Sequence, residues 1–152
     1  MTREGDRRDL AAMLHPLLRA LLAAERPVLA RHGVSMWGYV VLNALAEGST
    51  RTQAALAEAI GADKTRIIRT LDELQEAGWI SRHPDPADRR ARLLDITAEG
   101  RRVRQAVRKQ IRANESRWLA RLPAADRQAF LRSVQVLSGL APDELAGTTE
   151  SD

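Results

Sequence analysis

Residues 52–100 read TQAALAEAIGADKTRIIRTLDELQEAGWISRHPDPADRRARLLDITAEG, and this stretch decides the fold. Its first half predicts two short helices, over residues 53–60 and 64–77, because each apolar-periodic run follows a side chain that can cap a helix. Gly61 lies in the turn between them. Two short helices joined by a glycine-containing turn of three or four residues form a helix-turn-helix.

The second half of the stretch has a different periodicity. Residues 79–82 predict a short strand, residues 83–90 a turn-rich loop that contains prolines, and residues 91–96 a returning strand. The expected product is a β-hairpin with a long tip. Thr97 should cap the helix that follows, although Gly100 in its first turn weakens the start.

Helical periodicity continues on both sides of this stretch. The expected helices cover residues 9–31, 35–47, 98–121 and 124–140. Pro16 and Pro27 should kink or split the first of these helices. Residues 141–152 are expected to be disordered. The fold class is therefore mainly α with a small β-hairpin, a winged helix-turn-helix lobe plus a helical dimerisation region.

Composition excludes several classes of protein. The 152 residues correspond to about one domain, and 44% hydrophobic content suffices for a core. No apolar run approaches the ~20 residues of a membrane span. The charged N-terminal stretch lacks a signal-peptide core, so we expect a cytoplasmic protein with no membrane partner. The absence of cysteine excludes disulfides, zinc–thiolate sites and a thiol nucleophile.

The cationic residues are unevenly placed. Arginine supplies 22 of the 24 cations, which suits bidentate recognition of phosphates and base edges, although a GC-rich genome would produce the same bias. The net charge is only +1 over residues 51–92 but +7 over residues 101–121. Two readings of the basic segment stay open: a solvated face that pairs with acidic residues, or attraction of DNA or an acidic partner.

The second helix of the helix-turn-helix has two faces. Its apolar residues fall on one side, and the opposite side carries Arg66, Arg69, Thr70 and Glu73 at positions i, i+3, i+4 and i+7. An apolar face that holds the helix and a polar face presented to the major groove are what a recognition helix needs. An ordinary solvated helix face is the alternative.

The tip of the hairpin carries several arginines beside two aspartates. Arginine is the favoured side chain in a narrow minor groove, where the negative potential is concentrated. Asp88 is close enough in sequence to pair with Arg90 or Arg92 and brace the loop, and a merely soluble loop is the alternative. The full set of expected DNA contacts is Thr52, Gln53, Lys64, Thr65, Arg66, Arg69, Thr70, Arg89, Arg90 and Arg92.

Three runs of sequence resemble the MarR family of bacterial winged-helix regulators: QAALA at residues 53–57, LDELQEAGWISR at residues 71–82 and DPADRRARLLDITAEG at residues 85–100. The resemblance extends over roughly residues 10–140. It implies an obligate homodimer that binds a pseudo-palindromic operator on double-stranded DNA, usually as a repressor. It also implies that Asp88 shapes the wing and that an arginine of the pair 89–90 enters the minor groove.

A dimer is also expected because a lone lobe would leave the apolar stripes of three long helices without partners. The predicted interface comprises Leu10, Leu14, Leu17, Leu21, Trp118, Phe130 and Val134. The expected organisation is an N-terminal dimerisation helix in residues 1–34, a DNA-binding lobe in 35–97, C-terminal dimerisation helices in 98–140 and a tail in 141–152. Two recognition helices would then read half-sites ~34–36 Å apart.

Members of the family often respond to small, frequently aromatic anions or to thiol oxidation, and the absence of cysteine excludes the thiol route. By position, the candidates to line a pocket for a small-molecule effector are Met13, His15, Met36, Trp37 and Tyr39. Each is also a plausible core or solvated residue. The prolines in the first helix are departures from the family pattern.

Other functional classes have weaker support. The three histidines are scattered and show no metal-ligand spacing, and no Gly-rich phosphate loop or Gly-x-Ser-x-Gly turn is present. We therefore expect no enzyme activity, no metal and no cofactor. A regulator without a ligand, or a helical adaptor for acidic partners, remains the alternative to a ligand-controlled DNA-binding regulator.

Overall fold

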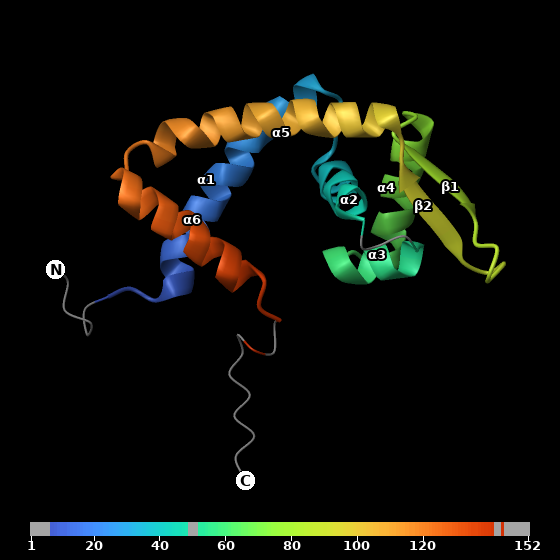
Figure 1. Cartoon of the computed structure of the whole chain (residues 1–152), viewed down its shortest axis with the longest axis horizontal. Helices are drawn as coiled ribbons and strands as arrows, with labels where there is room; N and C mark the ends of the chain where they lie inside the picture. The colour runs from blue at the N-terminus through green and yellow to red at the C-terminus, as the bar shows by residue number, and fades with distance from the viewer. Residues whose placement is uncertain (1–6, 49–51, 142–143, 145–152) are drawn as a thin grey trace, which may run out of the picture. The chain divides into compact units, whose positions relative to one another are not determined.

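The computed structural model describes residues 7–48, 52–141 and 144 (Figure 1). The chain divides into two compact units, residues 1–112 and 113–152, which are described separately. Within the described residues, the elements are α1 (Leu10–Arg31), α2 (Met36–Glu47), α3 (Gln53–Ile60), α4 (Lys64–Glu76), β1 (Ile80–Pro84), β2 (Arg92–Ile96), α5 (Ala98–Leu119) and α6 (Ala124–Ser138). The predicted fold class, mainly helical with one hairpin, is confirmed. The expectation for residues 141–152 falls almost wholly outside the described residues.

Four of the helix starts are fixed by the predicted caps, and at one of them, the start of α5, Thr97 Oγ1 accepts from the N–H of Gly100 at 3.0 Å. The side chain of Ser35 accepts a hydrogen bond from the N–H of Gly38 at 2.9 Å, and that of Thr52 accepts from Ala55 at 3.2 Å. Asp63 Oδ1 accepts from the N–H of Arg66 at 2.8 Å. Each bond satisfies a backbone donor that the first turn of a helix leaves without a partner. The start of α4, the second helix of the helix-turn-helix, is thereby defined.

The prolines, which were expected to kink or split α1, do not split it, because α1 runs without interruption from Leu10 to Arg31. Pro16 lacks the N–H that would bond to the carbonyl of Ala12. That carbonyl instead accepts a long hydrogen bond, 3.5 Å, from the guanidinium of Arg8. A partner from outside the helix thus compensates for one of the lost bonds.

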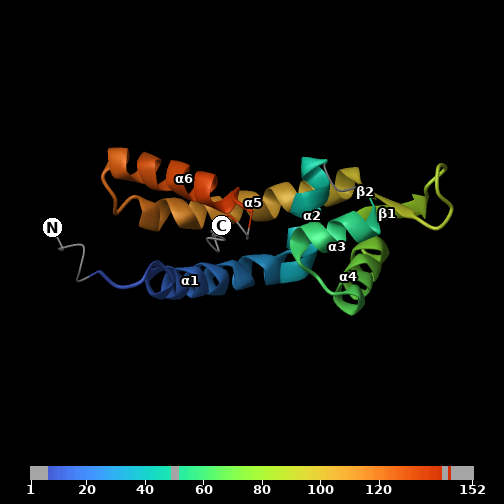
Figure 2. The same ribbon diagram turned by 90° about the horizontal axis from the view of Figure 1, so that it is seen from below.

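The first strand of the hairpin differs from its prediction at both of its ends. Strand β1 begins at Ile80 rather than at residue 79 and continues through Pro84, which pairs with Arg92. An additional antiparallel bridge joins Thr52 to Leu93, so the residue before α3 lies against β2. The hairpin is therefore attached to the helix-turn-helix by main-chain pairing, and its tip projects beyond α3 and α4 (Figure 2).

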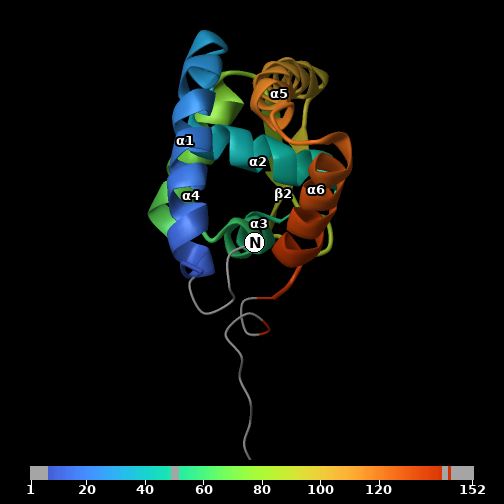
Figure 3. The ribbon, with the colours of Figure 1, turned by 90° about the vertical axis from the view of Figure 1, so that its left-hand side faces the viewer.

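A single apolar core holds the first unit together. Helix α2 lies between the first half of α5 and α3 (Figures 1 and 3). The largest fully buried side chains come from α1 to α5 and β2, namely Val28, Val41, Leu42, Leu56, Ile67, Leu71, Leu94 and Val107. The helix-turn-helix and the hairpin thus share one core, and the surface that they present is built on a fixed support.

The second unit contains the end of α5 and all of α6. Helix α5 ends at Leu119 and α6 at Ser138, two residues earlier in each case than the sequence predicts. Arg127 donates from Nε to the carbonyl of Leu119 at 3.2 Å and from its guanidinium to that of Leu122 at 3.3 Å. These bonds satisfy carbonyls that a helix end leaves free, so Arg127 fixes the turn between the two helices.

Among the described helices, none combines the length and the apolar character that crossing a bilayer would require.

Candidate nucleic-acid interface

Helix α4 contacts α2, α3 and β1, and these contacts decide which of its side chains face outward. Thr70 was expected on the outward face, but it is only 6% exposed, so that part of the prediction is wrong. Ile68 was expected on the apolar side, but it is 37% exposed. The outward face of α4 is therefore rotated relative to the one that hydrophobicity predicts.

The rotation has a steric cause in the crossing of α2 over α4. A side chain at Gly38 would meet Ser35 Oγ at 3.0 Å and Leu74 Cδ2 at 3.3 Å, so the missing side chain allows a close approach. Thr70 precedes Leu74 by one helical turn and lies on the same side. Thr70 is therefore turned toward α2, where it lies at the wall of a pocket with Ser35 and Trp37.

The exposed residues at the centre of α4 form a new stripe. Thr65, Ile68, Arg69 and Asp72 are all exposed and follow the spacing i, i+3, i+4 and i+7. The Arg69 side chain is 83% exposed, and its Nε lies 3.2 Å from Oε1 of Glu73. We define these four residues as the outer stripe of α4. Two of them, Thr65 and Arg69, are among the predicted DNA contacts.

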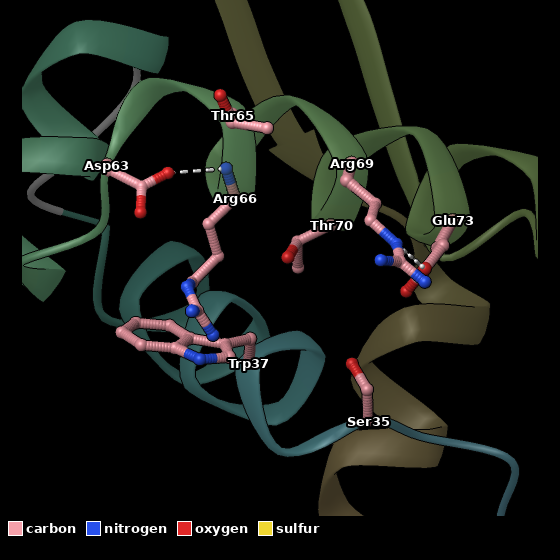
Figure 4. Close-up of a pocket in the computed structure, with 8 residues that line it drawn as sticks. All are labelled: Ser35, Trp37, Asp63, Thr65, Arg66, Arg69, Thr70 and Glu73. Atoms are coloured by element: carbon pink, nitrogen blue, oxygen red, sulfur yellow. Dashed lines mark hydrogen bonds and ion pairs between the residues drawn. The ribbon is translucent and has the colours of Figure 1, made fainter.

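The side chain of Arg66 points away from the outer stripe of α4 and toward α2. Its guanidinium lies over the ring of Trp37, with 5.0 Å from Cζ to the ring centroid (Figure 4). A cation over the indole face is attracted by the ring quadrupole. Both residues line a pocket of about 390 Å³ between the start of α2 and α4, together with Ser35, Asp63, Thr65, Arg69, Thr70 and Glu73. We call this the Trp37 pocket.

A second hollow joins α3, α4 and the hairpin. It has a volume of about 480 Å³, and five of the predicted DNA contacts line it: Thr52, Gln53, Lys64, Arg90 and Arg92. Its floor includes Ala54, Ala57 and Ile67. The structure thus brings together polar side chains from three separate parts of the sequence, and we call this hollow the basic groove.

The hairpin tip is braced by its aspartates through the main chain. Asp88 Oδ1 accepts from the N–H of Arg90 at 3.0 Å, and Asp85 Oδ1 accepts from that of Ala87 at 2.9 Å. The sequence suggested a guanidinium as the partner of Asp88, whereas the bond found here is to a backbone amide. Arg89, Arg90 and Arg92 are exposed, so the tip displays cations on a defined turn.

Arg82, expected from the sequence among the arginines of the hairpin tip, lies instead within β1 and is a positioning residue. From β1, its Nε donates to Oε1 of Gln75 at 2.5 Å, and its guanidinium also contacts Asp72. Only 22% of this side chain is exposed. The pair joins the hairpin to α4, and it also places a cation beside the one carboxylate of the outer stripe. The signal in the sequence was the strand alternation, which puts Arg82 on the same side as the buried Leu94.

The remaining predicted sites are dispersed. Of the five candidates for an effector pocket, only Trp37 lines the Trp37 pocket; Met13 and His15 are exposed on α1, while Met36 and Tyr39 pack against the core. The predicted dimer residues Leu10, Leu14 and Val134 are exposed, and Leu17, Leu21, Trp118 and Phe130 are half-buried. Within the part of the chain that the structure describes, no three His, Asp or Glu side chains cluster as a metal site would require.

Comparisons with known proteins give a consistent result. The sequence pattern of the MarR family matches residues 32–91. The transcriptional regulator HosA of Escherichia coli is 31% identical over 97 residues, which cover 64% of this chain and 72% of HosA. The crystal structure of MarR matches with a TM-score of 0.78 and 25% identity, covering 91% of this chain and 92% of MarR. That of CouR from Rhodococcus jostii RHA1, bound to p-coumaroyl-CoA, matches with a TM-score of 0.71 and 28% identity, covering 88% and 94%.

Proposed function

The chain belongs to the MarR family of DNA-binding transcriptional regulators, and from this membership we propose that it is a homodimeric repressor of a pseudo-palindromic operator. The MarR family comprises regulators and not enzymes, which confirms the expectation that the chain has no enzyme activity. The observation that carries the proposal is the basic groove. In it, the start of α3, the start of α4 and the base of the hairpin tip present Thr52, Gln53, Lys64, Arg90 and Arg92 to one ligand.

The chemistry of the basic groove and the outer stripe suits duplex DNA. Lys64, Arg90 and Arg92 supply charge for phosphates, and the hydroxyl and amide of Thr52 and Gln53 supply hydrogen bonds that fix register. The outer stripe of α4 adds Arg69, whose guanidinium can donate to two acceptors of guanine in the major groove. Phosphate contacts give affinity, and base contacts give sequence preference.

The exposed apolar side chains of α1 and α6 support the dimer. Leu10 and Leu14 are 51% and 45% exposed, and Val134 is 44% exposed. Residues of this kind at helical spacing are buried in a self-complementary contact when two copies pack about a two-fold axis. We propose that the predicted interface residues of both helices serve this purpose, so that two basic grooves address two half-sites.

Selection of genomic fragments bound by the purified protein, followed by mobility-shift titration, tests this function. Lys64→Ala, Arg69→Ala and Arg90→Ala should each weaken operator binding, and each lost phosphate contact should flatten the plot of log K against log salt by about one unit. Arg132→Ala is the matched control, because it removes an exposed arginine of α6 that belongs to neither the groove nor the outer stripe. Binding without any sequence preference would instead support a helical adaptor.

We further propose that a small aromatic anion releases the repressor by occupying the Trp37 pocket. The indole of Trp37 supplies a stacking surface and Arg66 supplies positive charge at the same pocket, while Arg69 is paired with Glu73. CouR, a relative at 28% identity, has been crystallised with p-coumaroyl-CoA. Since the chain has no cysteine, thiol oxidation is excluded as the signal.

Calorimetric titration with p-coumarate and with p-coumaroyl-CoA tests the effector proposal. Binding should weaken in Trp37→Leu and persist in Trp37→Phe, which keeps an aromatic face. The bound anion should lower operator affinity in the same samples, since a ligand that prefers one state shifts the population toward it. Operator binding that is indifferent to every aromatic anion tried would favour a regulator that works without a ligand.

A further inference from the structure

The outer stripe of α4 contains one apolar side chain among polar ones. Ile68 is 37% exposed. Its neighbours in the stripe are polar or charged: Thr65 lies one turn before it, and Arg69 lies directly beside it. The core does not use this side chain, because the buried residues of α4 are Ile67, Thr70, Leu71 and Leu74. In a helix whose outer face otherwise carries hydroxyl, guanidinium and carboxylate groups, this isoleucine needs its own explanation.

We propose that Ile68 is a specificity-determining residue that contacts the C5 methyl group of a thymine in each operator half-site. The proposal rests on the proposed operator binding through α4. Among the groups that base pairs display in the major groove, the thymine methyl is the apolar one, and apolar side chains recognise it by contact. Ile68 offers the matching chemistry on the face that the groove would meet.

The position of Ile68 along α4 fits this role. It is the fifth residue of the helix, within the first two turns, and the N-terminal part of a recognition helix is the part that contacts base edges. Thr65 and Ile68 are three residues apart, which is a rise of about 4.5 Å. This distance is a little more than one base-pair step of about 3.4 Å. The two side chains therefore lie close enough along α4 to reach base pairs of one half-site.

The charge around Ile68 is also compatible with DNA. Asp72, the acidic member of the outer stripe, contacts the guanidinium of Arg82, so its repulsion of phosphates is reduced. Arg69 stands beside Ile68 and can donate to a guanine or a phosphate. Methyl contact by Ile68 and hydrogen bonding by Arg69 would then read adjacent features of one half-site.

The test uses full-length protein and the operator obtained by fragment selection. Each thymine is replaced in turn by deoxyuridine, which removes only the methyl group. The wild-type protein should lose about fourfold in affinity at one thymine of each half-site, the value expected from burying one methyl group. Ile68→Ala should bind the thymine and uracil operators equally, while Ile68→Val should keep most of the discrimination.

Arg69→Ala is the matched control in the same stripe. It should weaken binding to both operators and leave their ratio unchanged. Circular dichroism melting shows whether Ile68→Ala is folded, which is expected because the side chain is partly exposed and alanine favours a helix. Two outcomes would overturn the inference about Ile68 and leave the proposed function intact. In the first, the wild type binds the operator with the same affinity after every replacement of thymine by uracil. In the second, Ile68→Ala still distinguishes the thymine operator from the uracil operator. Failure of the wild type to select any operator would overturn the proposed function and the inference with it.

Discussion

At Gly100 the first turn of α5 passes so close to the hairpin that no side chain fits. An added Cβ would overlap the carbonyl oxygen of Trp79 and lie 2.9 Å from its carbonyl carbon. The contact is reinforced by Thr97, whose hydroxyl donates to the carbonyl of Gly78 at 2.8 Å and accepts from the N–H of Gly100 at 3.0 Å. Gly100 lowers the helix propensity of the first turn of α5, but the nearby carbonyl of Trp79 leaves room only for a glycine there.

We expect Gly100→Ala to destabilise the protein. Forcing a methyl group into a packed site costs about 3 kcal/mol, and the better helix propensity of alanine offsets ~1 kcal/mol. Urea denaturation at fixed protein concentration should therefore show a net loss of about 2 kcal/mol. Gly139→Ala is the control, since a Cβ there meets carbonyl oxygens only at 3.5 Å; equal losses in both variants would contradict the steric account.

The difference between Thr70 and Ile68 shows what the sequence alone can predict at this scale. Periodicity places α4 and its caps correctly, because these depend on neighbouring residues. The phase of the buried face depends on where α2 crosses, and that crossing is set by Gly38 against Leu74, 36 residues apart (74 − 38). Hydrophobicity ranks Ile68 above Thr70 as a core residue, because it does not include the position at which α2 crosses α4.

At the scale of elements, α4 is held at its start by one carboxylate. Asp63 accepts from the N–H of Arg66 at 2.8 Å, so the cap fixes the turn that carries Lys64, Thr65 and Arg66. This is the turn from which side chains reach both the basic groove and the Trp37 pocket.

Asp63→Ala should lower the free energy of unfolding by about 1 kcal/mol, the usual value of an N-cap, and should weaken operator binding by fraying the first turn. Asp63→Ser removes the same charge but retains a capping oxygen. The comparison of the two variants by urea denaturation and mobility shift isolates the cap from the charge. If serine proves as damaging as alanine, the cap is not the cause.

The hairpin and α4 act as a joined pair because Arg82 connects them. The sequence predicts each element, but strand alternation alone does not identify Gln75 and Asp72 as the partners of this arginine. These partners come from the packing of β1 beside α4, which is a tertiary contact. Sequence reasoning therefore finds the pieces of the interface and leaves their coupling undetermined.

Arg82→Lys should loosen the hairpin while keeping the charge. A lysine cannot reproduce the planar, two-partner contact of a guanidinium. The loss of one hydrogen bond of about 1 kcal/mol would weaken operator binding by at most about fivefold, and amide exchange in β1 should become faster. Arg102→Lys, which alters an arginine paired with Glu99 along α5, should change neither quantity; an Arg82→Lys hairpin with unchanged exchange would refute the coupling.

At the scale of the whole molecule, the net charge of +4 gives little guidance to the binding surface. The excess of +7 lies in residues 101–121 and not in the helix-turn-helix. Part of it is already engaged within the protein, since Arg104 Nε donates to Asn43 Oδ1 at 2.7 Å and Arg102 pairs with Glu99. The proposed binding of DNA in the basic groove depends on the directions of a few side chains, which total charge does not report.

Assembly gives the prediction at this scale. If the proposed dimer forms, Val134→Asp should convert it to monomers by placing a charge on the proposed interface. Operator affinity should then fall by about a hundredfold, because two half-sites are no longer bound by linked heads. Val136→Asp is the control: it lies two positions away, on the other side of α6, and is 67% exposed. Sedimentation equilibrium of both variants checks this, and a dimeric Val134→Asp would show that the interface lies elsewhere.

The closed base of the hairpin makes it a lever. Thr97 closes this base, because its N–H donates to the carbonyl of Trp79 and its hydroxyl donates to that of Gly78, and the tip at residues 85–91 lies at the far end of the two strands. A five-residue strand is about 17 Å long, so a tilt of ~10° at the base moves the tip by about 3 Å. That displacement equals the length of a hydrogen bond. A small rotation at the base is therefore enough to move the tip arginines into or out of contact with a groove.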